Sequence, residues 1–137
     1  MKENPPINVW EKCELREWLN STFIENAFSS QQISRMTNES VADKVFVLSV
    51  EEVEKYFKTV ADRQAYPTAY LAEKTRMDKN DFFQWYTRSP GLEEHNMSPD
   101  IWIVSVDTNG EFHDSQPDMR IGFGVQGVRP AIWLSLK

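Results

Sequence analysis

The sequence contains a single cysteine, Cys13, in 137 residues. One cysteine cannot form a disulfide bond within the chain. Together with both histidines it would supply only three ligands of a four-ligand structural zinc site, so carboxylates would have to complete such a site. We therefore expect packing, rather than disulfides or structural zinc, to stabilise the fold.

Long apolar runs are also missing from the sequence. No stretch approaches the roughly 18 consecutive apolar residues of a membrane span, and no basic segment followed by an apolar run stands near Met1. The given chain is expected to be soluble, without a signal peptide or transmembrane segment. Its compartment is left open.

Basic residues are too few and too scattered to indicate a nucleic-acid-binding protein. Fifteen Lys and Arg stand against 21 Asp and Glu, which gives a net charge of -6 at pH 7. A polyanion is repelled by such a charge unless a basic patch opposes it, and the lysines and arginines between residues 51 and 79 are interspersed with acidic residues. We therefore expect no nucleic-acid partner.

The common catalytic motifs are absent too. The sequence has no G-x-S-x-G, no H-E-x-x-H and no glycine-rich phosphate loop, so it lacks hydrolase, metalloprotease and nucleotide-binding signals. His95 and His113 would have to meet across neighbouring loops to act as metal ligands or as an acid–base pair. Because their segments lack the spacing of metal ligands, surface positions are the favoured interpretation.

Aromatic residues, in contrast, are abundant. There are five Trp, eight Phe and four Tyr, and hydrophobic residues make up 40% of the chain. Large aromatic side chains can fill a core, and a chain of this length buries roughly two thirds of its unfolded surface. The sequence predicts a single folded domain over residues 1–137.

Helical patterns dominate the first half of the sequence. One apolar face predicts a helix over residues 9–27; its members at helical spacing are Leu15, Trp18, Leu19, Phe23 and Ala27. Asn8 and Glu11 form its candidate capping box. A second box begins at Ser29 and predicts a short helix through Met36.

A strand–turn–helix pattern follows. The apolar run over residues 44–48 is typical of a strand in the middle of a sheet. Ser49 and Glu52 then form a capping box for a helix. Another short helix is expected to start at Pro67 or Thr68.

Strand patterns dominate the second half. Residues 82–86 are strand-like, residues 89–91 predict a turn, and a strand over 101–106 leads to Asn109-Gly110, the strongest short hairpin signal. The last predicted strand covers residues 131–136. Helices first and strands later indicate an α+β fold.

Two short motifs, WYTRSPG at residues 85–91 and GVRPAIWL at 127–134, each set an arginine beside a proline and among apolar residues. An unpaired buried charge is costly, so the two guanidinium groups must bind carbonyls or carboxylates. We expect both arginines, and three buried tryptophans, to have structural roles: Arg88, Arg129, Trp18, Trp85 and Trp133.

Two further blocks, WEKCELREWLN at residues 10–20 and DKVFVLS at 43–49, complete a recognisable order. The chain resembles an uncharacterised family of bacterial domains of unknown function that carry W-x-x-S-x-L-R-x-W-L-N, D-K-V-F-L-L-S, W-W-L-R-S-P-G and G-V-R-P-A-L-W-L. That family is similar in layout to the C-type-lectin-like fold shared with formylglycine-generating enzymes and with variable proteins of diversity-generating retroelements. The resemblance implies early helices packed on a small, mainly antiparallel sheet with long late loops.

The start of the chain departs from that family. Its members usually begin with strands upstream of the first helix, whereas here only nine residues precede Trp10. Such folds pair their first and last strands, so the strand at 131–136 would lose a neighbour and expose an edge. Either a homodimer or a segment removed from the chain is expected to cover it.

The resemblance to formylglycine-generating enzymes also bears on whether the chain is an enzyme. Formylglycine-generating enzymes hold copper with a pair of cysteines, because thiolates are the soft ligands that monovalent copper prefers. Only Cys13 is present, at a position where the resembling family usually has serine. A metal- or oxygen-dependent enzyme of this type is therefore disfavoured, and Cys13 is interpreted as a small buried helix residue.

The late loops over residues 91–100 and 113–120 are the expected place for ligand contacts, because loops carry binding residues on a rigid scaffold. Their polar side chains are Glu94, His95, Asn96, Asp100, His113, Asp114 and Arg120. Aromatic side chains that could stack on sugars are Trp85, Tyr86, Trp102 and Trp133, with core packing as the default.

Two weaker signals remain. Residues 107–111 supply oxygen ligands around a glycine, so a structural calcium site is an alternative interpretation of this segment. A hairpin turn explains these residues better. Asn20 begins an N-x-S/T sequon, yet it falls inside the first predicted helix.

These observations favour a non-catalytic recognition or interaction module for an unidentified carbohydrate or protein, with no assigned catalytic residue, metal or cofactor. Two alternatives stay open. One is a metal- or oxygen-dependent enzyme, and the other is a structural part of a larger assembly.

Overall fold

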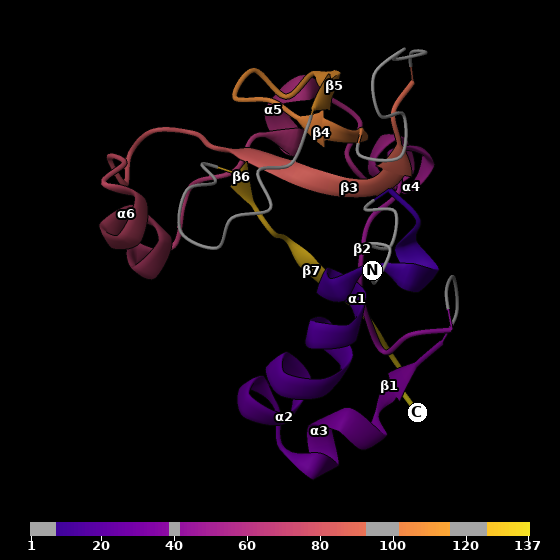
Figure 1. Ribbon diagram of the computed structural model, residues 1–137. Coiled ribbons are helices and arrows are strands. Elements are labelled where there is room, and N and C mark those ends of the chain that lie inside the picture. Colours follow the sequence, from indigo (N-terminus) through magenta and orange to yellow (C-terminus); the bar gives the residue numbers. More distant parts are fainter. Residues whose placement is uncertain (1–7, 39–41, 93–101, 116–125) are drawn as a thin grey trace, which may run out of the picture.

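The computed structural model describes residues 8–38, 42–92, 102–115 and 126–137 as short helices and two sheets, an α+β arrangement (Figure 1). One sheet has three strands and the other has four, and the pairing is mainly antiparallel. Each helix in these residues is too short or too polar to cross a membrane.

The N-terminal helical segment consists of four short pieces: η1 Trp10–Lys12, α1 Glu14–Trp18, the π-helical turn η2 Leu19–Phe23, and α2 Ile24–Ala27. The α-helix begins at Glu14 because Cys13 is extended and its Sγ accepts a hydrogen bond from Arg16 N at 3.4 Å. Val9, which precedes η1, makes no side-chain cap. The prediction that Asn8 caps a helix starting at residue 9 is therefore wrong.

The π-helical turn changes which side chains face the core. Leu19 is fully buried, and the next buried residue is Ile24, five positions later, because a π turn inserts one residue into the helical repeat. Regular spacing predicted Phe23 and Ala27 on the apolar face, but Phe23 is only partly buried and Ala27 is exposed. Trp18 is 48% exposed, so the prediction that it is buried is wrong, and its ring packs on Phe23 with centroids 5.4 Å apart.

The three-stranded sheet joins the two ends of the chain. Its strands are β1 Met36–Thr37, β2 Val45–Val47 and β7 Pro130–Leu134, in the order β1-β7-β2. β7 pairs antiparallel with both neighbours, with Thr37 opposite Trp133 and Val45 opposite Ile132. The last strand is central, so the prediction that it loses a neighbour is wrong. β2, predicted in the middle of a sheet, lies at its edge.

The four-stranded sheet consists of β3 Gln84–Pro90, β4 Ile103–Val106, β5 Phe112–Ser115 and β6 Gln126–Gly127, in the order β5-β4-β3-β6. β3 and β6 are parallel, and the other pairs are antiparallel. The turn predicted at 89–91 is wrong because β3 continues through Pro90 after a register shift.

The predicted hairpin at Asn109-Gly110 is confirmed between β4 and β5. Gly110 has φ +81°, and a Cβ atom there would lie 2.0 Å from Val60 O. Only glycine combines that backbone conformation with so close an approach.

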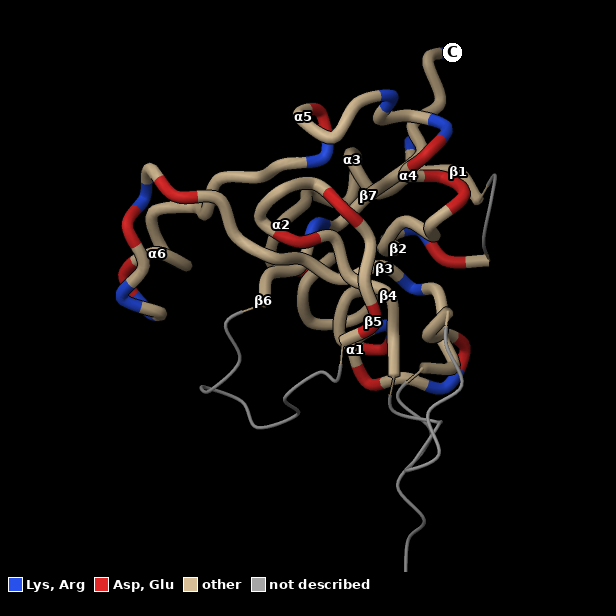
Figure 2. The backbone as a smooth tube through the Cα atoms, turned by 90° about the horizontal axis from the view of Figure 1, so that it is seen from above, with Lys and Arg blue, Asp and Glu red and all other residues tan. Residues whose placement is uncertain are grey.

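Four further helices begin with side-chain caps: α3 Ser30–Ser34, α4 Val50–Tyr56, α5 Val60–Arg63 and α6 Ala69–Thr75. The capping boxes predicted at Ser29 and Ser49 are confirmed, and Thr68 caps α6. α3 stops before Met36, contrary to the prediction, because Met36 pairs with β7. Figures 1 and 2 both show α6 set apart from the other elements. Figure 2 also shows acidic and basic residues interspersed along the chain.

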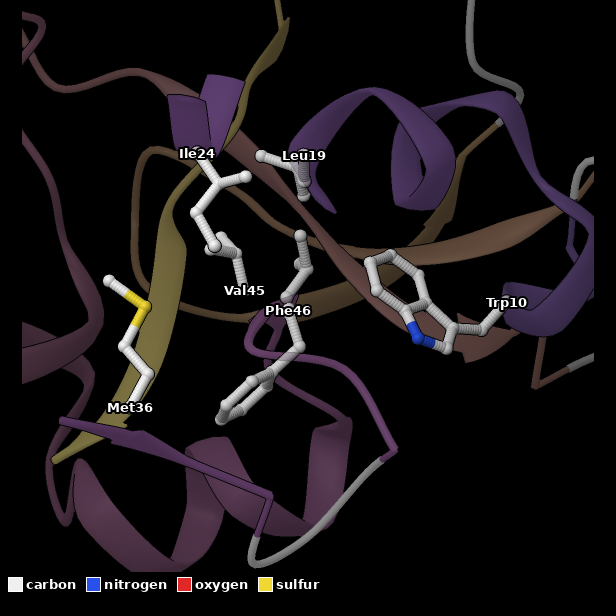
Figure 3. Packing of buried hydrophobic residues seen from close by; sticks show 7 residues of the cluster. Trp10, Leu19, Ile24, Met36, Val45 and Phe46 are labelled. Atoms are coloured by element: carbon white, nitrogen blue, oxygen red, sulfur yellow. The ribbon is translucent and has the colours of Figure 1, made fainter. Parts of the chain in front are cut away.

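Buried side chains form two clusters. The Phe46 cluster packs the N-terminal helices on the three-stranded sheet and comprises Trp10, Leu19, Ile24, Met36, Val45, Phe46 and Val47 (Figure 3). The Trp85 cluster packs α4 and the segment after α5 against the four-stranded sheet and comprises Val53, Ala65, Phe83, Trp85 and Val106. Leu48 contacts both clusters, so the strand–helix turn after β2 joins them.

Candidate ligand-binding groove

Asp43 links the first helical segment to β2. Its carboxylate accepts hydrogen bonds from Trp10 Nε1 and from Arg16 Nε, each at 2.9 Å, and Arg16 Nη2 lies 2.9 Å from Asp43 Oδ1. The hydrogen bond from Arg16 to Asp43 raises the pKa of the guanidinium. Two of the sequence blocks, 10–20 and 43–49, are thus joined by one buried carboxylate.

Asn20 pairs with the backbone of β2 as a neighbouring strand would. Its Oδ1 accepts hydrogen bonds from Lys44 N at 3.1 Å and Val45 N at 3.0 Å, and its Nδ2 donates to Val45 O at 2.7 Å and to Arg16 O at 3.0 Å. The side chain therefore covers the edge of β2 that faces away from β7. This use of the amide explains why asparagine stands in the π-helical turn.

Arg88 connects β3 to β2 and α4. Its Nη1 donates to Val47 O at 2.7 Å and to Glu52 Oε2, and its Nη2 donates to Glu52 Oε1 at 2.9 Å. Glu52 Oε2 also accepts from Ser49 N at 2.9 Å. Both charged side chains are only 14% exposed. The guanidinium is therefore a mostly buried cation paired with a carboxylate.

Arg129 has different surroundings. Its guanidinium carbon lies 4.7 Å from the ring centroid of Trp85 and 5.1 Å from that of Phe57. Its Nη1 donates a long hydrogen bond to Arg63 O at 3.5 Å. Burial lowers the pKa of Arg129. Within the described part of the chain, no carboxylate lies at salt-bridge distance from it.

Of the predicted ligand residues, only His113 and Asp114 lie in the described part of the chain. Glu94, His95, Asn96, Asp100 and Arg120 lie outside it. His113 and Asp114 are neighbours in β5, opposite Ser105 and Val104, so their side chains leave opposite faces of the strand.

The two side chains also have separate partners. His113 Nε2 lies 2.9 Å from Gln84 Nε2, and His113 Nδ1 lies 3.8 Å from Asp107 Oδ2. Asp114 Oδ1 accepts a hydrogen bond from Leu92 N at 2.6 Å. The described residues therefore do not bring His113 and Asp114 together into one site.

The segment at residues 107–111, for which calcium was the alternative, is the predicted hairpin turn. Asp107 Oδ1 accepts hydrogen bonds from Asn109 N at 2.8 Å and Glu111 N at 3.0 Å. This oxygen is therefore engaged in shaping the turn. Among the described residues, no group of three His, Cys, Asp or Glu side chains is arranged to hold a metal ion.

An open depression lies between α4 and the end of β7. This α4–β7 groove has a volume of about 680 Å³ and is lined by Thr37, Glu52, Lys55, Tyr56, Trp133, Leu134, Ser135, Leu136 and Lys137. The sequence predicted that Trp133 is buried, but it is only partly buried. Its ring meets that of Tyr56 edge to face, with centroids 6.0 Å apart. Tyr56 is 45% exposed and Leu134 is 53% exposed.

Glu52 and Lys55, two charged side chains of the groove, have different partners. The Glu52 carboxylate is bound by Arg88 and by Ser49 N. The Lys55 ammonium lies 5.3 Å from the ring centroid of Tyr56. The groove therefore presents apolar and aromatic surface next to a lysine, while its carboxylate already has partners.

Sequence reasoning named one groove residue, Trp133, among the aromatic side chains that could stack on a sugar, although it favoured burial of Trp133 in the core. It missed Lys55 and Tyr56, which stand on an ordinary amphipathic helix. Of the other aromatic candidates, Trp85 is fully buried in the core, and Tyr86 and Trp102 are partly buried. The groove arises only when β7 pairs with β1 beside α4, so no local pattern could have revealed it.

Comparison with protein families gives a match over residues 2–136 to the family described as a domain of unknown function, DUF6273. The chain belongs to the DUF6273 family. Neither a curated protein nor a solved structure matches it. The expected membership in a family of domains of unknown function is therefore confirmed, and the likeness of this DUF6273 domain to the C-type-lectin-like fold stays a prediction.

Proposed function

We propose that this DUF6273 domain is a non-catalytic recognition domain that binds an extended segment of a partner protein in the α4–β7 groove. The observation that carries the proposal is the groove itself, an open depression of about 680 Å³ that exposes Tyr56 and Leu134 beside Trp133. Exposed aromatic and aliphatic side chains gathered in a concave surface mark sites of recognition.

The mixture of side chains favours a peptide over a sugar. Sugars stack on flat aromatic faces and bind hydrogen-bonding groups, whereas aliphatic side chains offer neither. Leu134 is 53% exposed and Leu136 is 97% exposed in the groove lining. Apolar side chains of a peptide can fill the spaces between these leucines and Tyr56, and Lys55 can hydrogen-bond peptide carbonyls.

The test uses the purified domain on a peptide array and on a glycan array, with hits measured by calorimetry. We expect peptide hits that carry apolar side chains. Replacing an aromatic anchor at an interface typically costs 2 kcal/mol or more, which is roughly 30-fold in affinity. Tyr56→Ala and Leu134→Ser should therefore each weaken binding, with the larger loss at Tyr56.

Matched controls are provided by exposed residues that do not line the groove. Tyr70→Ala removes an aromatic ring that is 71% exposed on α6, and it should leave peptide affinity unchanged. Glycan hits without peptide hits would overturn the assignment to a protein ligand. Peptide hits that tolerate both Tyr56→Ala and Leu134→Ser would show that the groove is not the site.

A further inference from the structure

The guanidinium of Arg129 has few partners for a cation that is half-buried. A guanidinium has five N–H donors. Only Nη1 of Arg129 makes a hydrogen bond with a described residue, to Arg63 O at 3.5 Å, which is the upper limit for such a bond. The guanidinium carbon lies over the rings of Trp85 and Phe57, at 4.7 Å and 5.1 Å from their centroids. The N–H edges of the group are the part that carries directed hydrogen-bonding capacity.

A second arginine lies beside it. Arg63, at the end of α5, donates from Nε to Phe57 O at 3.2 Å, and its guanidinium carbon lies 4.8 Å from the ring centroid of Phe112. Phe57 therefore contacts both arginines, one through its carbonyl and the other through its ring. Arg63 forms no salt bridge with any residue in the described ranges.

Two other arginines of the fold have a carboxylate partner, which Arg129 and Arg63 lack among the described residues. Arg16 binds Asp43, and Arg88 binds Glu52 through two nitrogen atoms. A partly desolvated charge without an opposite charge is costly. Aromatic rings attract a cation, but they do not replace a bidentate anion. Burial lowers the pKa of Arg129, which is the effect expected of a cation that has lost water without gaining a carboxylate.

We propose that Arg129 and Arg63 form a binding site for a small oxyanion, either a carboxylate or a phosphate group of a ligand. Arg129 supplies the forked N–H edge, and Trp85 and Phe57 pack against its guanidinium. Arg63, whose Nε donates to Phe57 O, adds a second positive charge. None of these four residues lines the α4–β7 groove, so the site is separate from the proposed peptide site.

The test is an NMR titration of nitrogen-15-labelled protein with sodium acetate and, separately, with sodium phosphate, at ionic strength held constant with sodium chloride. The reporter is the indole N–H of Trp85, which donates to Arg63 O at 2.9 Å and whose ring contacts Arg129. We expect a saturable shift of this signal with at least one of the two anions. Saturation by acetate alone assigns a planar carboxylate site, and saturation by phosphate assigns a tetrahedral one.

Three variants make the result specific. Hydrogen bonds to a charged group contribute about 1.5–3 kcal/mol, so Arg129→Met should weaken anion binding at least about tenfold. Arg129→Lys keeps the charge without the fork and should also weaken it. Arg76→Met, at the exposed arginine that follows α6, should leave the affinity unchanged. A shift that rises linearly with both anions, or one that is equal in wild type and Arg129→Met, would overturn the proposal.

Discussion

The two buried clusters place their arginines in opposite chemical surroundings. Around the Phe46 cluster, Arg16 and Arg88 are paired with Asp43 and Glu52. Beside the Trp85 cluster, Arg129 contacts two aromatic rings and makes one long hydrogen bond to a carbonyl. The RSPG and GVRP motifs look alike as sequences, yet only the arginine of the first binds a carboxylate among the described residues. Similar motifs can therefore pair the arginine with a carboxylate of the fold or leave its N–H donors for a ligand.

The largest expected effect is that of Arg88→Met. The substitution keeps the length of the side chain but leaves the mostly buried Glu52 without its cation and Val47 O without a donor. Removing one partner of a buried ion pair is strongly destabilising, so we expect a loss of about 3 kcal/mol in the free energy of unfolding, measured by urea denaturation. A double variant, Arg88→Met with Glu52→Gln, should recover part of that loss because no unpaired charge remains. A loss below about 1 kcal/mol for Arg88→Met would contradict the paired role.

A smaller effect is expected at Asn20. Asn20→Ala removes the side chain that bonds Lys44 N, Val45 N and Val45 O along the edge of β2. Buried backbone groups left without partners typically cost 1–3 kcal/mol, so we expect a loss of about 2 kcal/mol in urea denaturation, together with faster hydrogen exchange at the Val45 amide. The matched control is Asn80→Ala, whose amide makes an exposed contact to Asp78. Equal stability for the two variants would show that Asn20 does not hold the strand.

The smallest effect is expected for Arg129→Met. Methionine fills a similar space between Phe57 and Trp85, and no carboxylate among the described residues is left unpaired by the loss of the charge. Exposed cation–π contacts contribute only about 0.5–1 kcal/mol, and burial already disfavours the charged form. We therefore expect a change below about 1 kcal/mol in the same urea assay. A loss as large as that of Arg88→Met would mean that Arg129 is a structural cross-link of the same kind.

Local elements were predictable where a side chain bonds to its own neighbourhood. Ser49 and Glu52 form their capping box within four residues, and the Asn109-Gly110 turn depends on a conformation that glycine adopts freely. The same reasoning failed at Phe23, because the π-helical turn that moves the buried stripe from Phe23 to Ile24 leaves no mark in a regular apolar period.

Site prediction was limited for a related reason. The sequence singled out Trp133, but the groove also needs Tyr56 and Thr37, which lie far from it along the chain. The polar residues chosen in the late loops include His113 and Asp114, and the structure gives these two separate partners. Adjacent polar residues in a strand point to opposite faces, so closeness in sequence does not bring their side chains into one site.

By itself the sequence indicated helices first and strands later, three of the helix caps and the tight hairpin, because each of these depends on residues within a few positions of one another. It also indicated that Arg88 and Arg129 sit among apolar residues. Only the tertiary structure decided that β7 lies between β1 and β2, that a groove opens beside α4, and that Arg88 meets a carboxylate while Arg129 meets aromatic rings. Such contacts join residues tens of positions apart, and they are fixed by how the packed elements fit together rather than by any local preference of the chain.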